Sequence, residues 1–245
     1  MTTPRILATS GGFVPGPVQM SVRLGEMLTG ALACTNKSRP RVCLVYTATG
    51  DPDLYYARSY EAFNEAGCDV TELRLFPQPT ADPSERLCGS DLVWVGGGSV
   101  ANLLALWRLH GVDVAMREAW DAGVILGGVS AGSLCWHEGG TTDSFGPTLR
   151  PVTDALGFLP YANGVHYDHE AQRRPLLHQL MKDHTLGPLG FATDDQVGIW
   201  FEGTEPTTVV ADVAFDPDDG PAAYRVELVG EDIVETRVGV GGSFS

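Results

Sequence analysis

The sequence predicts an α/β fold, in which helices flank a mostly parallel β-sheet and antiparallel strands follow near the carboxyl terminus. Short apolar runs rich in β-branched residues alternate with longer helical stretches over about the first 130 residues. Buried strands that alternate with helices form a parallel sheet with both faces covered. After residue 196, apolar runs are instead separated only by turns, which is typical of antiparallel strands.

The first half contains regular elements that follow in chain order. Five runs have the apolar composition of strands: residues 5–9, 41–47, 69–76, 92–95 and 123–127. Four stretches have helical character: residues 17–33, residues 55–66, a segment after the glycines at 96–98 that runs through 109, and residues 114–121. We expect residues 78–83 to form a loop.

The second half is less regular. Residues 139–157 are rich in Gly, Thr, Asp and Pro, which predicts a long irregular loop. A helix is expected over residues 170–184 and a short strand over 190–192. The antiparallel strands are expected over residues 197–201, 207–215, 223–229 and 232–238. No repeat or linker marks a boundary, so we expect residues 1–245 to form a single domain.

The composition limits the kinds of partner. The chain has 16 Lys and Arg against 31 Asp and Glu, a net charge of −15, which disfavours binding to nucleic acids or anionic membranes. The beginning of the chain lacks a signal-peptide pattern, and the five cysteines show no CxxC pairing. We therefore expect a cytoplasmic protein without metal or cofactor. The sequence does not determine the oligomeric state, and a homodimer is one alternative.

Residues 128–132 carry the most informative motif, Gly-Val-Ser-Ala-Gly, between an apolar strand and a helical stretch. This is the context of a nucleophile elbow, a tight turn that exposes a serine at the head of a helix. Gly128 and Gly132 fit such a turn because larger side chains would collide across it. We therefore predict that Ser130 is a nucleophile. The alternative is a purely structural strand-to-helix turn.

A serine nucleophile needs a histidine base. His166 follows a glycine and a short apolar run, as a loop histidine at the end of a strand would. His169 is the reserve candidate, although a helix-cap role suits it better. The other four histidines lie in predicted helices, at a helix end, or too close to Ser130 in the sequence: His110, His137, His178 and His184.

Three motifs together resemble a known family. Residues 96–99 read Gly-Gly-Gly-Ser, residues 128–133 read Gly-Val-Ser-Ala-Gly-Ser, and residues 164–166 read Gly-Val-His. Their order and spacing, between residue 92 and about residue 200, resemble the aspartyl dipeptidase (peptidase E) family of serine peptidases. That family is related to cyanophycinase, and its fold is similar to class I glutamine amidotransferases. The resemblance implies that Ser130 is the nucleophile and His166 the base.

The resemblance also implies an acidic residue that completes a catalytic triad with Ser130 and His166. At this residue the chain departs from the family pattern. The family has a glutamate in a loop downstream of the histidine, whereas this chain has Asp194 and Asp195 there. We expect Asp195 to be the acid, with Asp194 as the fallback, and a solvated turn is the alternative interpretation of the pair. Asp143 occupies a loop where the family also has an important aspartate, and we expect it to support the active site.

The oxyanion formed during attack needs two hydrogen-bond donors, and backbone amides are the most readily preorganised. The amide of Ala131 is one candidate, and Gly97 or Gly98 would supply the other. The glycines could instead hold a phosphate, but neither a GxGxxG motif nor a Gly-Lys-Ser/Thr motif is present.

The sequence thus predicts a serine peptidase that hydrolyses small peptides through an acyl-enzyme. A dipeptidase with a preference for amino-terminal Asp-X remains open, because Arg173 and Arg174 lie near the position of the family's basic specificity residue. Two other interpretations also remain: an esterase or amidase that uses the same residues, and a catalytically silent binding module with an amidotransferase-like fold.

Overall fold

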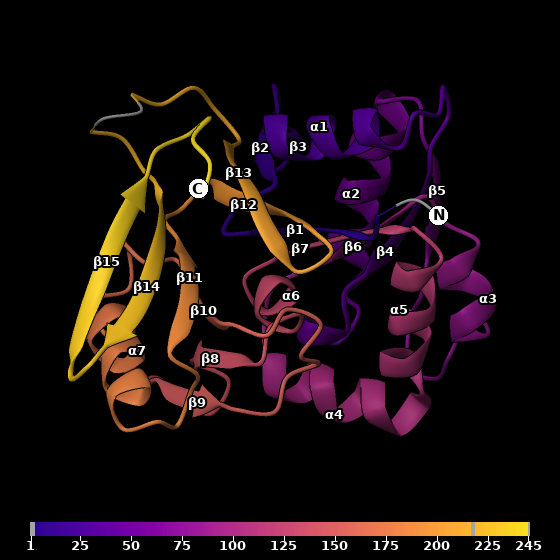
Figure 1. Cartoon of the computed structure of the whole chain (residues 1–245). Coiled ribbons are helices and arrows are strands. Elements are labelled where there is room, and N and C mark those ends of the chain that lie inside the picture. The colour runs from indigo at the N-terminus through magenta and orange to yellow at the C-terminus, as the bar shows by residue number, and fades with distance from the viewer. Residues whose placement is uncertain (1–2, 217–218, 245) are drawn as a thin grey trace.

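The computed structural model describes residues 3–216 and 219–244, and two large β-sheets dominate it (Figure 1). The first sheet has seven strands in the order β13-β12-β1-β7-β6-β4-β5. Their bounds are Arg5–Thr9 (β1), Arg41–Val45 (β4), Asp69–Glu72 (β5), Leu92–Val95 (β6), Ile125–Val129 (β7), Val197–Glu202 (β12) and Glu205–Ala211 (β13). The five neighbouring strands β1, β7, β6, β4 and β5 are parallel to one another. Strands β12 and β13 extend the sheet next to β1, and each is antiparallel to its neighbour.

Helices cover both faces of the seven-stranded sheet (Figure 1). Successive residues of a strand point to opposite faces, so Leu92 and Trp94 pack with α1 and α2, whereas Val93 and Val95 pack with α4 and α5. The bounds of these helices are Glu26–Cys34 (α1), Asp53–Glu65 (α2), Val100–His110 (α4) and Val112–Asp121 (α5). The predicted parallel sheet with two covered faces is therefore confirmed.

The second sheet has six strands in the order β15-β14-β11-β10-β8-β9, and α7 packs on one of its faces. It lies at the left of Figure 1, with β14 and β15 at its edge. The bounds are Gly139–Thr142 (β8), Arg150–Val152 (β9), Ala162–Val165 (β10), Arg173–Lys182 (α7), Leu189–Thr193 (β11), Ala223–Val229 (β14) and Asp232–Val238 (β15). The antiparallel strands expected after residue 196 are present, divided between the two sheets.

Two local expectations were wrong, and one short helix was not expected. Residues 17–33 do not form one helix, because this segment contains β3 (Val22–Leu24), which pairs with the preceding β2 (Phe13–Pro15), and α1 starts only after Gly25. Proline and glycine at 15–17 explain this, since they favour a turn over a helix. Residues 139–157 contain β8 and β9 instead of being wholly irregular. A short helix, α3 (Pro83–Cys88), follows the expected loop.

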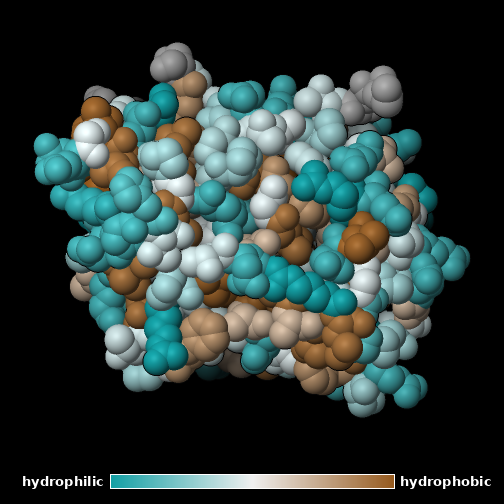
Figure 2. Space-filling view, turned by 60° about the horizontal axis from the view of Figure 1, so that its bottom comes forward, coloured by the Kyte–Doolittle hydropathy of each residue, from teal (hydrophilic) through white to brown (hydrophobic). Residues whose placement is uncertain are grey.

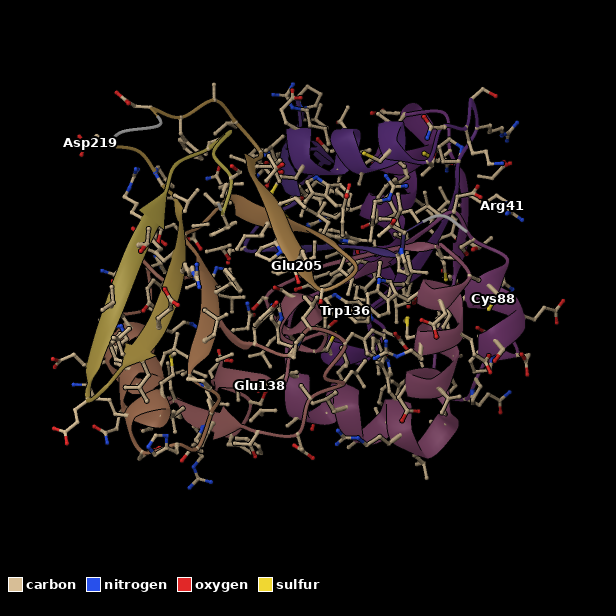
Figure 3. All side chains as sticks on the ribbon, in the orientation of Figure 1. Arg41, Cys88, Trp136, Glu138, Glu205 and Asp219 are labelled. Atoms are coloured by element: carbon tan, nitrogen blue, oxygen red, sulfur yellow. The ribbon has the colours of Figure 1, made fainter. Side chains whose placement is uncertain are left out.

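The largest core cluster joins the two sheets. Trp136 lies at the centre of the molecule (Figure 3), where it packs against Trp107 and Phe158. Hydrophilic residues cover most of the face shown in Figure 2, with smaller hydrophobic areas between them. Among the described residues, no helix has both the length and the apolar character that crossing a membrane requires.

Candidate active site

The elbow places Ser130 between β7 and the short helix α6 (Ala131–Leu134). Its backbone angles, φ 56° and ψ −112°, are strained for a residue with a side chain. The flanking glycines permit this turn: a Cβ on Gly128 would lie 2.3 Å from the carbonyl oxygen of Gly132, and a Cβ on Gly132 would lie 2.2 Å from that of Val95. The structure therefore has a strand, a tight turn at Ser130 and a helix in succession.

Free backbone amides surround the serine. No described residue accepts a hydrogen bond from the amides of Gly97, Gly98 or Ala131. Gly97 lies directly beside Ser130, because a Cβ on this glycine would be 3.2 Å from the Ser130 Cβ and 3.8 Å from its Oγ. The Ser130 hydroxyl also has no hydrogen-bond partner among the described residues. The site therefore has a free hydroxyl with unused donors close to it.

His166 directly follows β10, and its Nδ1 contacts Oδ1 of Asp195. Because an ionised carboxylate only accepts hydrogen bonds, this contact places a proton on Nδ1, and in the neutral imidazole the lone pair is then on Nε2. Both side chains are half-buried, with 28% of His166 and 39% of Asp195 exposed. The structure thus brings together the predicted base and the preferred acid.

The end of β1 connects the elbow to the histidine and its acid. The Ser130 amide donates to the carbonyl of Thr9 (3.0 Å), the His166 amide to Oγ of Ser10 (2.9 Å), and the Gln196 amide to the carbonyl of Ser10 (3.0 Å). All three donors have positive φ: 56°, 52° and 64°. Such strain persists where surrounding contacts fix the backbone, and it is typical of active sites.

Sequence reasoning missed Ser10. Its side chain is buried, and its hydroxyl also donates to the carbonyl of Thr193 at the end of β11 (3.1 Å). The only signal in the sequence is a polar residue between an apolar strand and the glycines at 11–12, and this signal alone does not identify a partner.

Asp194 and Asp195 point in different directions. The amide of Asp195 is held by Oδ1 of Asp168 (2.9 Å), another contact that the sequence did not indicate. The Asp194 carboxylate is buried and accepts hydrogen bonds from the Ala222 amide (3.0 Å) and the Tyr224 hydroxyl (3.2 Å), and burial raises its pKa. Asp194 therefore anchors the start of β14, and its carboxylate does not contact His166.

Asp143 lies after β8 and is exposed. Together with Glu170 and Asp195 it interacts electrostatically with the guanidinium of Arg173, which is buried and donates to the carbonyl of Thr141 (2.8 Å). Burial lowers the pKa of Arg173, whereas the three carboxylates favour its charge. Asp143 and Asp195 thus both interact with the charge of Arg173, and Asp143 forms no hydrogen bond with His166.

Arg174 also has partners. Its guanidinium pairs with Glu235 (3.5 Å) and lies over the rings of Tyr167 and Tyr224. Arg173 and Arg174 are therefore both already engaged with groups of the chain itself.

The remaining histidines are not placed to serve as the base. His137 is fully buried, its Nδ1 lies 3.0 Å from the carbonyl of Ser133, and burial lowers its pKa to about 4. The reserve candidate His169 is exposed and forms no hydrogen bond or ion pair with a described residue. His178, on α7, contacts Glu235 of β15 (2.8 Å). Within the described part of the chain, no group of three or more His, Cys, Asp or Glu could hold a metal ion.

Comparison with known proteins identifies the family. The family model described as peptidase family S51 matches residues 6–209, a span that includes Ser130, His166 and Asp195. The chain belongs to peptidase family S51. Relatives from this comparison carry the name peptidase E, so the expected resemblance is confirmed and the protein is a serine peptidase.

Relatives of this S51 chain include the uncharacterized peptidase YgaJ of Bacillus subtilis (strain 168), which is 38% identical over 225 residues and 92% of each chain. Peptidase E of Streptomyces coelicolor (strain ATCC BAA-471 / A3(2) / M145) is 32% identical over 128 residues, 52% of this chain and 51% of the relative. A crystal structure of a peptidase from an acI-B1 Actinobacterium superposes with a TM-score of 0.71 at 15% identity, covering 99% of this chain and 97% of the other. At 15% sequence identity, this structural similarity shows the fold alone.

Proposed function

We propose that the protein is a dipeptidase-like serine peptidase whose catalytic triad is Ser130, His166 and Asp195. The contact between His166 Nδ1 and Asp195 carries this proposal, because it orients Nε2 as the base and leaves the carboxylate to stabilise the imidazolium. Ser130 is hydrogen-bonded to Thr9, the last residue of β1, and His166 to Ser10, the residue directly after it, which supports their action on one substrate.

In this mechanism Ser130 Oγ attacks the peptide carbonyl carbon and its proton passes to Nε2 of His166. The amides of Ala131 and Gly97, with Gly98 as the alternative second donor, stabilise the oxyanion. His166 then gives the proton to the leaving amine as the C–N bond breaks, and an acyl-enzyme remains on Ser130. Water, activated by His166, hydrolyses the ester and restores the serine.

A preference for Asp-X substrates would need a cation that is free to bind a second carboxylate. Arg173 faces three carboxylates of the chain and Arg174 pairs with Glu235, so neither is such a cation. These two arginines therefore give no ground to expect an advantage of Asp-X dipeptides over other small dipeptides. We also propose a cytoplasmic location, because all five cysteines are unpaired, and cell fractionation would test it.

Purified protein offered a panel of dipeptides and simple esters, in parallel with a fluorophosphonate probe, tests the proposal. We expect labelling of Ser130 and hydrolysis of dipeptides, both lost in Ser130→Ala. Hydrolysis of esters without dipeptides would favour the esterase alternative. Absence of both labelling and hydrolysis would favour the silent binding module.

A further inference from the structure

A pocket of about 370 Å³ lies next to the elbow, and the proposed mechanism does not use it. The glycines at 96–98 and Val129, the residue before the nucleophile, form part of its wall. Since Gly97 also contacts Ser130, the pocket opens where a bound substrate carbonyl would be. Its volume is near the lower end of the range for ligand sites, about 300–1,000 Å³, which suits one side chain better than an extended peptide.

Aromatic rings dominate the rest of the lining. Phe13, Tyr46, Tyr55 and Trp94 surround the space, and Phe13 meets Trp94 edge to face with ring centroids 6.3 Å apart. The hydroxyl of Tyr46 is already paired with Ser59 Oγ (2.5 Å), and burial raises the pKa of Tyr46 to about 12, so this group stays neutral. The interior therefore offers an occupant mainly apolar contact.

The strand order defines which part of the substrate faces this pocket. β7, which leads into Ser130, lies between β1 and β6. His166 is hydrogen-bonded to Ser10, directly after β1. Most of the pocket is instead built on β6, on the segments that follow β6 and β4, and on α2. Phe13 and Val22 come from the β2–β3 hairpin, which packs against α2. Base and pocket thus lie on opposite sides of the nucleophile. Because the base protonates the leaving amine, the leaving group faces β1 and the acyl residue faces the pocket.

We propose that this pocket binds a large apolar side chain, above all an aromatic one, on the residue whose carbonyl Ser130 attacks. The inference rests on the proposed peptidase function and adds the class of substrate. An apolar side chain leaves water when it enters, and the ring edges and faces of the lining favour an aromatic occupant.

One cation lies in the pocket wall. Arg58 of α2 donates through Nη2 to Sδ of Met20 (3.3 Å) and forms no ion pair with a described residue. An acidic side chain at the acyl position is therefore the competing occupant, and the substrate panel must include it. Arg58 also has the reach to lie over a bound aromatic ring, which would favour the aromatic occupant further.

The test compares kcat/KM for Phe-Leu, Leu-Leu, Ala-Leu and Asp-Leu with the full-length chain. We expect Phe-Leu to exceed both Ala-Leu and Asp-Leu at least tenfold. Val22→Trp fills the pocket from β3, and it should lower the ratio of Phe-Leu to Ala-Leu at least tenfold. The matched control, Val18→Trp, changes an exposed valine of the same segment outside the pocket and should leave the ratio unchanged.

A second pair of variants tests the inference independently, in case Val22→Trp does not fold. Tyr55→Ala removes a ring that is 44% exposed on α2, and Leu54→Ala removes its 51% exposed neighbour, which does not line the pocket. We expect Tyr55→Ala to lower the Phe-Leu to Ala-Leu ratio threefold or more and Leu54→Ala to leave it unchanged. An unaltered ratio in both pocket variants, or a wild-type preference for Ala-Leu or Asp-Leu, would overturn the inference.

A binding measurement separates this inference from the proposed function. In Ser130→Ala, calorimetric titration should show at least tenfold tighter binding of Phe-Leu than of Ala-Leu, whether or not the wild-type chain hydrolyses dipeptides. If the wild type hydrolyses none of them but this difference is present, the proposed function fails and the pocket assignment stands. Equal affinities would overturn the pocket assignment alone.

Discussion

Ser130 and His166 belong to different sheets, and different kinds of contact hold them. Around Ser130, glycines within two residues allow backbone approaches that a Cβ would prevent. Around His166, hydrogen bonds that this residue donates to Ser10 and Asp195, residues 156 and 29 positions away, fix the backbone and the ring. The elbow is thus encoded locally, whereas the base and its acid depend on how the two sheets meet. The comparison predicts that substitutions in the two regions affect the rate of hydrolysis and the free energy of unfolding to different extents.

The largest effect should come from either reacting residue, because the nucleophile and the base act as one unit. Ser130→Ala and His166→Ala should each lower kcat by about 10⁶-fold, and the double variant should be no slower than either single one. Steady-state rates on one good dipeptide, with circular dichroism to confirm folding, measure this. Additive losses would show that the two residues do not work on the same step.

Steric change in the elbow should damage both rate and stability. In Gly128→Ala the new Cβ would lie 2.3 Å from the carbonyl oxygen of Gly132, so the turn must open and Ser130 must move. We expect a loss of about 1–3 kcal/mol in the free energy of unfolding, as for other overpacked sites, together with loss of activity. Urea denaturation provides the measurement. Wild-type stability in this variant would contradict the steric account of the elbow.

Loss of a long-range hydrogen bond should be milder. Ser10→Ala leaves the His166 amide without its acceptor, which should cost about 1–3 kcal/mol of stability. A displacement of the base by about 1 Å should lower kcat by roughly 100-fold. The same urea and rate measurements apply. A variant with unchanged kcat would show that Ser10 does not position the histidine.

The next prediction concerns stability alone. Burial lowers the pKa of His137 to about 4, below its value of about 6.5 in an unfolded chain, so the folded state binds fewer protons between these pH values. Stability should therefore fall as the pH drops from 7 to 4.5, with about 2–3 kcal/mol of the loss due to His137. His137→Gln should show a smaller fall over that range in urea denaturation. An identical pH dependence would contradict the assignment.

The same contrast explains how far the sequence could predict the structure. The parallel sheet and the strand, turn and helix around Ser130 were predictable because their signals, alternating apolar runs and Gly-x-Ser-x-Gly, lie within a few residues. The hairpin of β2 and β3 and the pairing of β8 with β9 were not predictable. Residues 13–24 and 139–152 are rich in turn-forming residues, so their local sequence does not indicate strands, and the strands there are stabilised by pairing with other strands.

The choice between Asp194 and Asp195 shows the same limit within the candidate site. Neighbouring residues at the end of β11 direct their side chains differently, one toward β14 and the other toward His166. Composition does not distinguish two consecutive aspartates, and only the place of β14 beside β11 shows which carboxylate is engaged elsewhere. The preference for Asp195 agrees with this geometry, while its catalytic role is a matter for experiment.

The most direct test of the proposed triad compares Asp195→Asn, Asp194→Asn and Asp143→Asn on one dipeptide. Asp195→Asn should lower kcat about 10⁴-fold, because an amide favours the wrong histidine tautomer and does not stabilise the imidazolium. Asp194→Asn should act mainly on stability through its contacts with Ala222 and Tyr224, and Asp143→Asn should have an intermediate effect on rate through Arg173. A severe loss of kcat in Asp143→Asn or Asp194→Asn, beside a mild one in Asp195→Asn, would contradict the triad.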